Sequence, residues 1–395
     1  LIAAACGSDD GDSSSSVGDA TATTAAPATT AAPATTAAPA TTAAPATSLR
    51  VAFIYDGTID QGGWNGAMDR GRQYLEEQMP GIEVVSVEGI SPGQAAQRAM
   101  SDLADEGYDV IVGTSTFDAD MVIVAPEFPD TDFYQACDAT VSENMGQFCI
   151  AVEEAAFVNG ALAATLSETG EIGYVAAFPI FFVLKPLNMF VAGARSVNPD
   201  ANVSVVFTNS WFDPGLELQA ANALIDSGAD VLTYDLSSPT VPEVAEQRGA
   251  HFIGYGYDDA RTQAPEAWAG GAIYNWGPLF VEAIQEMKAG TWEPGYVYGG
   301  YSDGWLDIAD FGDDVSQGTR QAITDLIAEI SAGNVDVFAG PLVDTDGNVI
   351  VPEGEAMDPY SRAICCEWTI EMAPVAQAEA LRVAFIYDGT IDQGG

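Results

Sequence analysis

The sequence predicts an α/β protein built from two doubly wound, Rossmann-like lobes around a ligand cleft. Three observations predict this fold. From residue 49 onward, short apolar runs alternate with helix-like segments, as in a parallel sheet covered by helices. The same rhythm restarts near residue 171. Roughly 320 to 350 residues remain after the unusual first 48, whereas a single core stops growing near about 250–300 residues.

The first lobe is predicted from short runs rich in Val, Ile and Tyr that end at Gly, Asp or Ser. Such runs are typical of strands buried on both faces. The strands are expected at Arg50–Tyr55, Glu83–Val87, Tyr108–Val112 and Thr131–Gln135, with helices at Trp64–Gln78 and Pro92–Glu106.

The second lobe repeats this alternation. Its strands are expected at Glu171–Ala176, Asn202–Phe207, Asp230–Tyr234 and Ala250–Tyr255, with helices at Leu184–Ser196, Gly215–Ser227 and Glu243–Arg248. We therefore expect lobe 1 to comprise residues 49–168 and about 273–300, and lobe 2 to comprise residues 169–272 and about 301–372. In open α/β sheets, ligands bind beyond the carboxyl ends of the strands, so the loops that follow these strands are the candidate site.

The amino-terminal residues predict a lipid anchor and a stalk. Residues 1–7, with Cys6 after a run of small apolar residues, are similar to the end of a bacterial lipoprotein signal. Residues 8–48 hold a Ser/Asp run and a repeated Ala-Thr-Thr-Ala-Ala-Pro unit. Such a segment has no large apolar side chain to bury, so we expect it to be disordered. The two features predict an extracytoplasmic protein on the outer face of the bacterial plasma membrane. A chance Ala-Cys pair is the alternative for Cys6.

The carboxyl-terminal tail, residues 373–395, carries an exact internal repeat. Leu381–Gly395 has the same sequence as Leu49–Gly63. Two explanations remain open: the start of a second copy of the domain, or a duplication made in sequence assembly.

The chain is strongly acidic, with 12 basic residues, 58 acidic residues and a net charge of −46. Phosphate binding needs Lys and Arg, so this balance excludes nucleic acid as a partner. The charge is typical of adaptation to salinity or of simple solubility. We expect a monomer, and no run of about 20 apolar residues predicts a membrane-spanning helix.

Enzyme motifs are weak in this sequence. Gly300–Gly304 matches the G-x-S-x-G pattern, but that chemistry needs a later histidine, and the single histidine, His251, comes earlier. We expect His251 to be structural and the glycine-rich motif to be a turn. The sequence therefore predicts no catalytic residues and no cofactor.

A calcium loop is also not expected. Asp344, Asp346, Asn348 and Glu355 have the right spacing, but Val349 stands where such a loop requires Gly. We interpret the segment as a hairpin whose second strand contains Val349–Val351, and we expect no metal site.

Four cysteines follow Cys6. Cys137 and Cys149 flank a polar stretch and can form a disulfide outside the cytoplasm, with two free buried thiols as the alternative. The adjacent Cys365 and Cys366 can form a vicinal disulfide or remain a reduced pair.

A family resemblance rests on ordered segments spread over the chain. They are Gly62–Asn65, Gly173–Pro179, Gly193–Pro199, Asn209–Pro214, Asn275–Pro278, Gly290–Trp292 and Phe338–Pro341. Through these segments the sequence resembles, from about Val51 to Ile370, the BMP (basic membrane protein) family of substrate-binding lipoproteins, also called PnrA-like or Med-like.

The resemblance implies a type I periplasmic-binding-protein fold, an ABC permease as partner, and a purine nucleoside or purine base as ligand. It implies that Trp64 stacks on the base and that Trp211 or Phe212 faces it from the other lobe, while carboxylates and amides hold the polar edge. The candidate ligand-binding residues are Asp60, Trp64, Asn65, Asp118, Asp120, Phe178, Asn209, Trp211, Phe212, Asp235, Asp258 and Asn275.

Two segments depart from the family pattern. Tyr234–Ser238 replaces a His-Thr-Asp run of the purine-binding relatives, and Ile180–Leu184 is more apolar than usual. Both lie at the predicted cleft, so a sugar stays open as the alternative ligand. A ligand sensor for a signalling partner is the alternative role, and core packing is the alternative role for Trp64 and Trp211.

Overall fold

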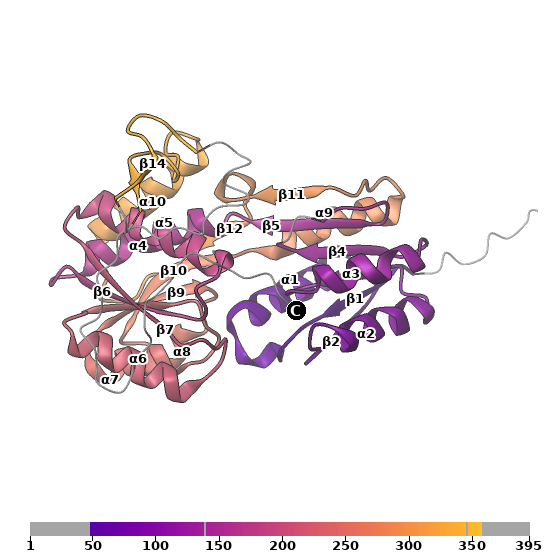
Figure 1. The fold of residues 1–395 in the computed structure, drawn as a ribbon, viewed down its shortest axis with the longest axis horizontal. Coiled ribbons are helices and arrows are strands. Elements are labelled where there is room, and N and C mark those ends of the chain that lie inside the picture. The colour runs from indigo at the N-terminus through magenta and orange to yellow at the C-terminus, as the bar shows by residue number, and fades with distance from the viewer. Residues whose placement is uncertain (1–47, 138–139, 345–346, 358–395) are drawn as a thin grey trace, which may run out of the picture. The chain divides into compact units, whose positions relative to one another are not determined.

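The computed structural model describes residues 48–137, 140–344 and 347–357. The expected anchor at Cys6, the stalk, the Cys365–Cys366 pair and the repeated tail lie outside these residues. The described chain forms two separate six-stranded sheets, each covered by helices (Figure 1). The fold is therefore α/β with two mostly parallel sheets, as the sequence predicts.

The first sheet, which we call lobe 1, has the order β11-β5-β4-β3-β1-β2, and every neighbouring pair is parallel. Its strands are β1 (Arg50–Ile54), β2 (Glu83–Val87), β3 (Val110–Gly113), β4 (Asp132–Ala136), β5 (Met145–Ile150) and β11 (Tyr296–Gly299). Its helices are α1 (Gly63–Gln78), α2 (Gln94–Asp105), α3 (Asp118–Val124) and α9 (Trp276–Ala289), with short 3-10 turns η1 (Ile59–Gln61) and η2 (Ala125–Glu127). Residues 51–54 of β1 are fully buried because helices cover both faces of the sheet.

The second sheet, lobe 2, has the order β12-β10-β9-β8-β6-β7, and only β12 is antiparallel to its neighbour. Its strands are β6 (Glu171–Ala176), β7 (Asn202–Phe207), β8 (Val231–Tyr234), β9 (His251–Gly256), β10 (Trp268–Tyr274) and β12 (Leu306–Ile308). Its helices are α4 (Val152–Leu166), α5 (Phe181–Val197), α6 (Pro214–Asp226), α7 (Thr240–Arg248), α8 (Ala260–Gln263) and α10 (Gln317–Ser331), with the 3-10 turn η3 (Tyr301–Asp303).

Helix α4 packs with lobe 2, so lobe 2 begins near residue 152 rather than at residue 169. The helix lies beside α5 and against strands β9 and β10 (Figure 1). Glycines make the α4–α5 contact close: a Cβ on Gly160 would stand 1.9 Å from the carbonyl oxygen of Phe190. The sequence did not indicate this placement because α4 is apolar on nearly all sides, so it shows no single face to match to one lobe.

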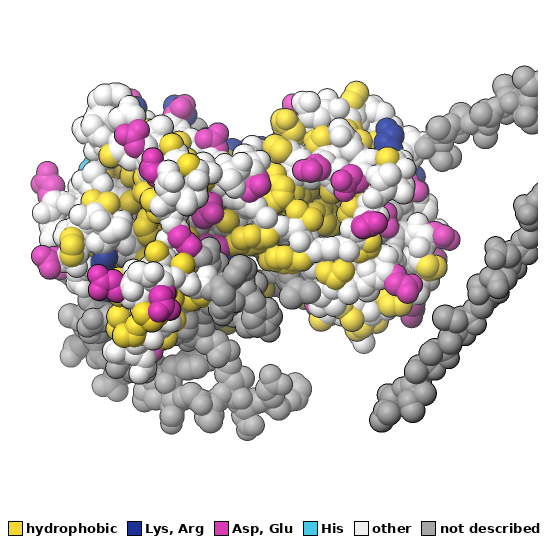
Figure 2. All heavy atoms as spheres, turned by 90° about the horizontal axis from the view of Figure 1, so that it is seen from above, with side chains coloured by type: hydrophobic (Ala, Val, Ile, Leu, Met, Phe, Trp, Pro, Cys, Tyr) yellow, Lys and Arg dark blue, Asp and Glu magenta, His cyan; other side chains and the backbone are white. Residues whose placement is uncertain are grey.

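The chain crosses between the two sheets three times in the described residues, after β5, after β10 and after β11. A short antiparallel pair, β13 (Leu342–Val343) with β14 (Val349–Val351), follows α10, so the strand expected at Val349–Val351 is present. None of the helices in the described residues is long and apolar enough to cross a membrane. Figure 2 shows Asp and Glu side chains over much of one face, with few Lys or Arg among them.

Candidate functional site

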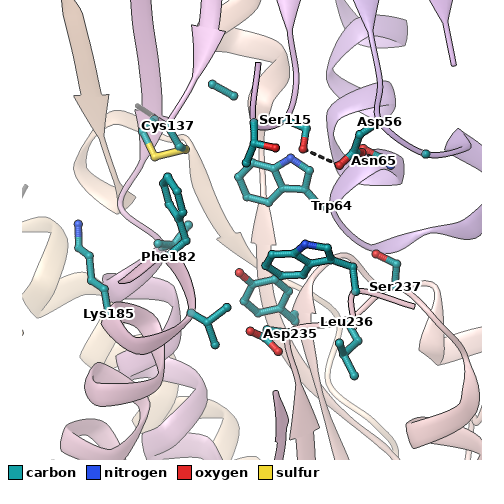
Figure 3. Close-up of a pocket in the computed structure, with 18 of the residues that line it drawn as sticks. Asp56, Trp64, Asn65, Ser115, Cys137, Phe182, Lys185, Asp235, Leu236 and Ser237 are labelled. Carbon is teal, nitrogen blue, oxygen red and sulfur yellow. Dashed lines mark hydrogen bonds between the residues drawn. A yellow bond between two sulfur atoms is a disulfide. The ribbon is translucent and has the colours of Figure 1, made fainter. Parts of the chain in front are cut away.

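A pocket of about 400 Å³ lies at the carboxyl ends of strands from both sheets. Lobe 1 contributes Asp56, Gly57, Trp64, Asn65, Ser115, Thr116, Ala136, Cys137, Cys149 and Tyr296, and lobe 2 contributes Val152, Phe181, Phe182, Val183, Lys185, Trp211, Phe212, Asp235, Leu236, Ser237 and Tyr255. The volume is in the range of small-molecule sites. Figure 3 shows labelled side chains from both lobes around this space.

Aromatic rings form much of the pocket wall. They are Trp64, Phe181, Phe182, Trp211, Phe212, Tyr255 and Tyr296. Flat apolar faces of this kind suit a flat ligand, because any aromatic ligand presents a π face on which they can stack.

Trp64 is held rigidly in the wall on the lobe 1 side. Its indole N–H donates to the carbonyl oxygen of Thr114 at 2.7 Å. Its ring meets Trp276 edge to face, with centroids 5.4 Å apart, and Tyr274 at 6.0 Å. With its N–H already bonded, Trp64 offers a ligand only its ring.

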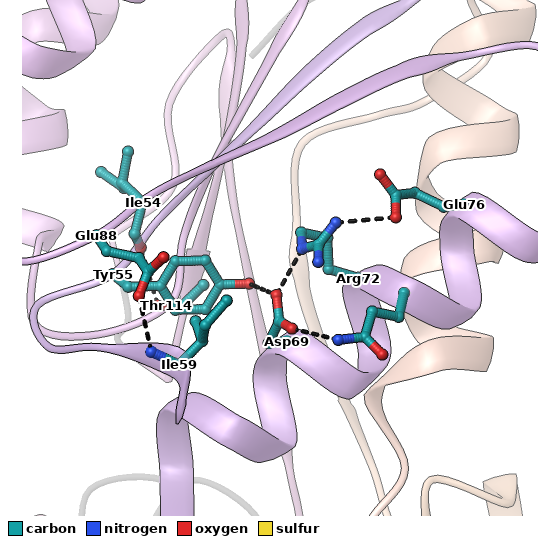
Figure 4. A network of polar contacts seen from close by, with 9 residues as sticks. Ile54, Tyr55, Ile59, Asp69, Arg72, Glu76, Glu88 and Thr114 are labelled. Carbon is teal, nitrogen blue, oxygen red and sulfur yellow. Dashed lines mark hydrogen bonds and ion pairs between the residues drawn. The ribbon is translucent and has the colours of Figure 1, made fainter. Parts of the chain in front are cut away.

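A buried polar network fixes the helix that carries Trp64 (Figure 4). Asp69 of α1 is 4% exposed and accepts hydrogen bonds from Arg72 at 2.5 Å, from Gln73 at 2.6 Å and from the hydroxyl of Tyr55 at 3.4 Å. A buried carboxylate is tolerated only with such donors. Because Tyr55 directly follows β1, the network ties α1 to the end of the central strand.

Trp211 and Phe212 lie in the wall on the lobe 2 side, and each is 46% exposed. Phe178 supports Trp211 from the side, with ring centroids 5.3 Å apart at 63°. Asn209 precedes them with a positive φ of 54°, a conformation that Asn tolerates better than most residues. This bend carries the chain from β7 into the loop that holds both rings.

Lobe 1 contributes a small polar cluster at the end of β1. Asp56 accepts hydrogen bonds from Asn65 Nδ2 at 3.1 Å and from the hydroxyl of Ser115 at 2.6 Å (Figure 3). The other amide atom, Asn65 Oδ1, is buried and has no hydrogen-bond partner among the described residues.

Lobe 2 contributes Asp235, directly after β8. Its side chain is 6% exposed, and Oδ1 accepts from the backbone N–H of Ala177 at 2.9 Å. The second oxygen, Oδ2, is buried and has no hydrogen-bond partner in the part of the chain that the structure describes. Burial away from water raises the pKa of Asp235 to about 7, because the charged form loses its hydration.

Lys185 on α5 is a buried cation in the same wall. Its ammonium lies 3.2 Å from a carboxylate oxygen of Glu153 and 3.4 Å from the hydroxyl of Tyr298. Tyr298 in turn donates to Glu153. The pair neutralises both buried charges, so this side of the pocket is polar without a large net field.

The lobes also touch each other directly beside the pocket. Arg70 of α1 pairs with Asp258 of lobe 2 at 2.7 Å and lies over the ring of Tyr257 at 4.0 Å. A Cβ on Gly62 would stand 2.1 Å from Asp259, and one on Gly63 would stand 2.6 Å from the hydroxyl of Ser237. We call these residues the contact side of the cleft, which adjoins the pocket at Ser237.

Five of the predicted ligand-binding residues lie in the pocket wall: Trp64, Asn65, Trp211, Phe212 and Asp235. The other seven do not line it. Phe178 and Asn209 support the Trp211 loop, and Asp258 pairs with Arg70 across the cleft. Asp60 is exposed in η1, and Asn275 donates to the carbonyl oxygen of Gly304 at a crossing between lobes.

Asp118 and Asp120 are occupied inside lobe 1. Asp118 accepts from Gln147 at 2.7 Å and Thr140 at 2.9 Å, and Asp120 accepts from Gly93 and Gln97, each at 2.8 Å. Both carboxylates therefore bond to other segments of lobe 1, and neither residue lines the pocket.

Sequence reasoning missed several wall residues. They include Asp56, Ser115, Lys185, Tyr255 and Tyr296. A signal existed for Asp56, because it directly follows the first strand. Phe181 and Phe182 belong to the apolar Ile180–Leu184 segment that was expected at the cleft, and both line the pocket. Cys137 and Cys149 form a disulfide, and both line the pocket.

Comparison with known proteins identifies the family. Residues 48–335 match the family described as ABC transporter substrate-binding protein PnrA-like. The chain is 32% identical to a purine-binding protein of Brucella abortus, over 78% of this chain and 89% of that protein. It is 33% identical to a putative ABC transporter glucose-binding protein of Haloferax volcanii, over 74% of this chain and 75% of that protein.

A solved solute-binding protein of Conexibacter woesei has a similar fold. The TM-score is 0.64 at 21% identity, and the alignment covers 73% of this chain and 98% of that one. Its likeness supports the fold seen here. By its family match and its relatives together, the chain belongs to the PnrA-like family of ABC transporter substrate-binding proteins.

Proposed function

We propose that this protein captures a purine base or purine nucleoside between its two lobes and delivers it to a membrane permease. Binding proteins of this family supply a small molecule to an ABC permease outside the cytoplasm. We also propose that a lipid on Cys6 holds the protein at the membrane. The name of the Brucella abortus relative supports the purine.

One observation carries the proposal: aromatic walls from opposite lobes line a single pocket. Trp64 comes from lobe 1, and Trp211 with Phe212 comes from lobe 2. Stacking contributes roughly 1–3 kcal/mol per base, so two walls contribute about 2–6 kcal/mol. Micromolar affinity needs about 8 kcal/mol, and polar contacts at the ligand edges must supply the rest.

A sugar is the second candidate, because the Haloferax volcanii relative is named as a putative glucose-binding protein. Sugars also stack on aromatic rings, but each hydroxyl group taken from water needs its own polar partner. The described pocket has more aromatic wall than free polar groups, and Lys185 and Asp56 are already bonded within the protein. This balance favours a flat heteroaromatic ligand over a polyhydroxylated one.

The test is a thermal-shift and calorimetric screen on the full chain, refolded from denaturant to remove any carried ligand. Adenine, guanine, adenosine, inosine and glucose are compared. We expect a purine to stabilise the protein by about 2.7 kcal/mol at a hundredfold excess over Kd. A shift with glucose alone would replace the purine by the sugar while leaving the family unchanged.

The matched variants are Trp211→Ala and Tyr74→Ala. Both residues are partly exposed, but only Trp211 lines the pocket. Trp211→Ala should weaken purine binding about tenfold or more, because one stacking wall is lost. Tyr74→Ala should leave the affinity unchanged.

The lipid anchor has a separate test. The sequence around Cys6, followed by a stalk without large apolar side chains, supports lipid attachment at that residue. In a bacterial host, the full chain should incorporate a labelled fatty acid and partition with membranes, and Cys6→Ala should abolish both. Membrane partition without Cys6 would contradict the anchor.

A further inference from the structure

The loop of residues 210–212 carries two rings of the lobe 2 wall, Trp211 and Phe212, and both rings are half-exposed. Its first end is tied to the sheet, because the N–H of Asn209 donates to a carbonyl oxygen after β6 at 2.8 Å. Its other end meets helix α6 at Asp213, the residue before the first turn. Half-exposed rings have few neighbours to hold them, so their placement depends on the anchors at the two ends of the loop.

A buried carboxylate on α6 supplies the second anchor. Glu217 is fully buried, and its Oε1 accepts the backbone N–H of Asp213 at 2.9 Å. Helix α6 has a separate cap, because the side chain of Asp213 accepts the N–H of Leu216 at 3.0 Å. The bond to Glu217 therefore holds the end of the loop in addition to the capped helix.

The other oxygen of Glu217 is bonded to the loop after β8. The hydroxyl of Ser238, a residue that is 1% exposed, donates to Oε2. The same hydroxyl lies 2.9 Å from the hydroxyl of Thr240 and accepts the backbone N–H of Thr240 at 3.2 Å. Both carboxylate oxygens thus have partners, which is the condition under which a charged group tolerates burial.

The two loops that Glu217 joins come from strands that are not neighbours. Strand β6 lies between β7 and β8 in the sheet, so no ladder hydrogen bond can join the ends of β7 and β8. The loop after β8 has its own tie to β6, from Asp235 to the N–H of Ala177 at 2.9 Å. Loss of Glu217 should therefore loosen the loop with Trp211 and Phe212 more than the loop with Asp235.

We infer that Glu217 is a positioning residue for ligand capture: its buried carboxylate holds Trp211 and Phe212 in the pocket wall by joining their loop to Ser238. Glu217 does not line the pocket, so it acts through the two rings and not by touching the ligand. The inference rests on the proposed function in one respect, because it takes a flat base as the ligand that the rings contact.

Hydrogen–deuterium exchange on the ligand-free full chain tests the anchor without any ligand. In Glu217→Ala, the N–H of Asp213 loses its acceptor, so this N–H should exchange at least about tenfold faster. Glu217→Gln should keep exchange slow, because its Oε1 still accepts from Asp213 and its NH₂ group can donate to the hydroxyl of Ser238.

Calorimetric titration with adenine tests the consequence for binding. Glu217→Ala should weaken adenine binding by about tenfold, because the rings must be ordered when the base binds. In a background that carries both Trp211→Ala and Phe212→Ala, the same change should alter the affinity by less than about twofold, since no ring is left to position. A merely structural role would lower the affinity equally in both backgrounds.

The matched control is Glu246→Ala, the same substitution in lobe 2. The carboxylate of Glu246 accepts the N–H of Ala267 at 2.7 Å, and neither residue lines the pocket. This variant should leave both the exchange of Asp213 and the affinity for adenine unchanged. If Glu217→Ala fails to fold, Ser238→Ala takes its place and should also give faster exchange at Asp213, because the carboxylate loses its second anchor.

Unchanged exchange at Asp213 in a folded Glu217→Ala variant would overturn the inference. An equal loss of affinity with and without the two rings would overturn it as well, while leaving purine binding intact. If adenine binds to none of these proteins, the proposed function fails and exchange alone decides: faster exchange at Asp213 supports the anchor, and unchanged exchange overturns it.

Discussion

The two sides of the cleft differ in what they need for closure. On the contact side, lobe 1 meets lobe 2 without any ligand: Gly62 and Gly63 approach Asp259 and Ser237, and Arg70 pairs with Asp258. On the pocket side, the lobes stand apart around about 400 Å³. On the first side the lobes contact each other, and on the second side Asn65 Oδ1 and Asp235 Oδ2 have no hydrogen-bond partner within the described residues.

We infer that the two sides have different roles in bringing the lobes together. The contact side sets the approach of the lobes through groups that are always present. We expect the pocket side to make closure of the lobes depend on a ligand, because a ligand shifts an equilibrium between two states only by its differential affinity for them. Changes on the contact side should therefore affect closure with any ligand, whereas changes in the pocket should affect particular ligands.

The largest effect is expected from Trp64→Ala. Trp64 packs on Trp276 and Tyr274 as well as lining the pocket, so its loss should lower the free energy of unfolding by about 3 kcal/mol and also weaken binding. Trp211→Ala, at a half-exposed ring, should weaken binding with little change in stability. Chemical denaturation and calorimetry on both variants separate the two effects. Equal loss of stability would contradict the structural role of Trp64.

The next effect concerns pH and stability. The folded-state pKa of Asp235 is raised from 3.8 to about 7, so the folded state binds a proton that the unfolded state releases. Its contribution is therefore full at low pH and is lost as the pH rises toward 8, by about 2 kcal/mol between pH 5.5 and 8. Asp235→Asn should remove this part of the slope when denaturation is measured at both pH values. An unchanged slope would contradict the burial of a titrating carboxyl at this position.

A smaller effect is expected from Gly63→Ala on the contact side. A Cβ there would stand 2.9 Å from the Cα of Ser237, so the lobes must move apart. Gly89→Ala is a matched control, because Gly89 also has positive φ but a Cβ there meets nothing within 4 Å. Relative to that control, Gly63→Ala should weaken binding of every ligand by about tenfold, or about 1.4 kcal/mol. Loss for one ligand alone would break the division between the two sides.

The smallest effect is expected from Arg70→Met. The Arg70–Asp258 pair is partly exposed on both partners, so its contribution is about 0.2–1 kcal/mol and is screened by salt. Small-angle scattering of the ligand-free protein should detect a more open average at low salt for the variant. The difference should disappear in about 1 M salt.

The sequence was sufficient for β1 to β4 of lobe 1 and β6 to β9 of lobe 2, which are short runs between loop residues, but it did not predict β10, β11 or β12. It was insufficient for β5 (Met145–Ile150), where Gly146 and Gln147 interrupt the pattern. Gln147 is buried there only because its amide donates to Asp118 and to the carbonyl oxygen of Thr140. Such a partnership between distant residues leaves no local signal.

Part of the pocket wall was predicted from the sequence, whereas ligand binding by these residues stays a prediction. Trp64 and Trp211 follow strands in segments that resemble the family, and both line the pocket. Asp118 and Asp120 also follow a strand, but their carboxylates already accept hydrogen bonds from other residues of lobe 1. Lys185 was missed because its buried charge is paired with Glu153 on α4, a segment that the sequence analysis placed in lobe 1.

The disulfide between Cys137 and Cys149 is part of the pocket surface as well as of the fold. It joins the end of β4 to the neighbouring strand β5, and both sulfur-bearing residues belong to the pocket wall. A preparation kept in reductant therefore carries two thiols beside the ligand in place of a covalent link. Affinities measured with and without reductant describe two different binding surfaces and should not be pooled.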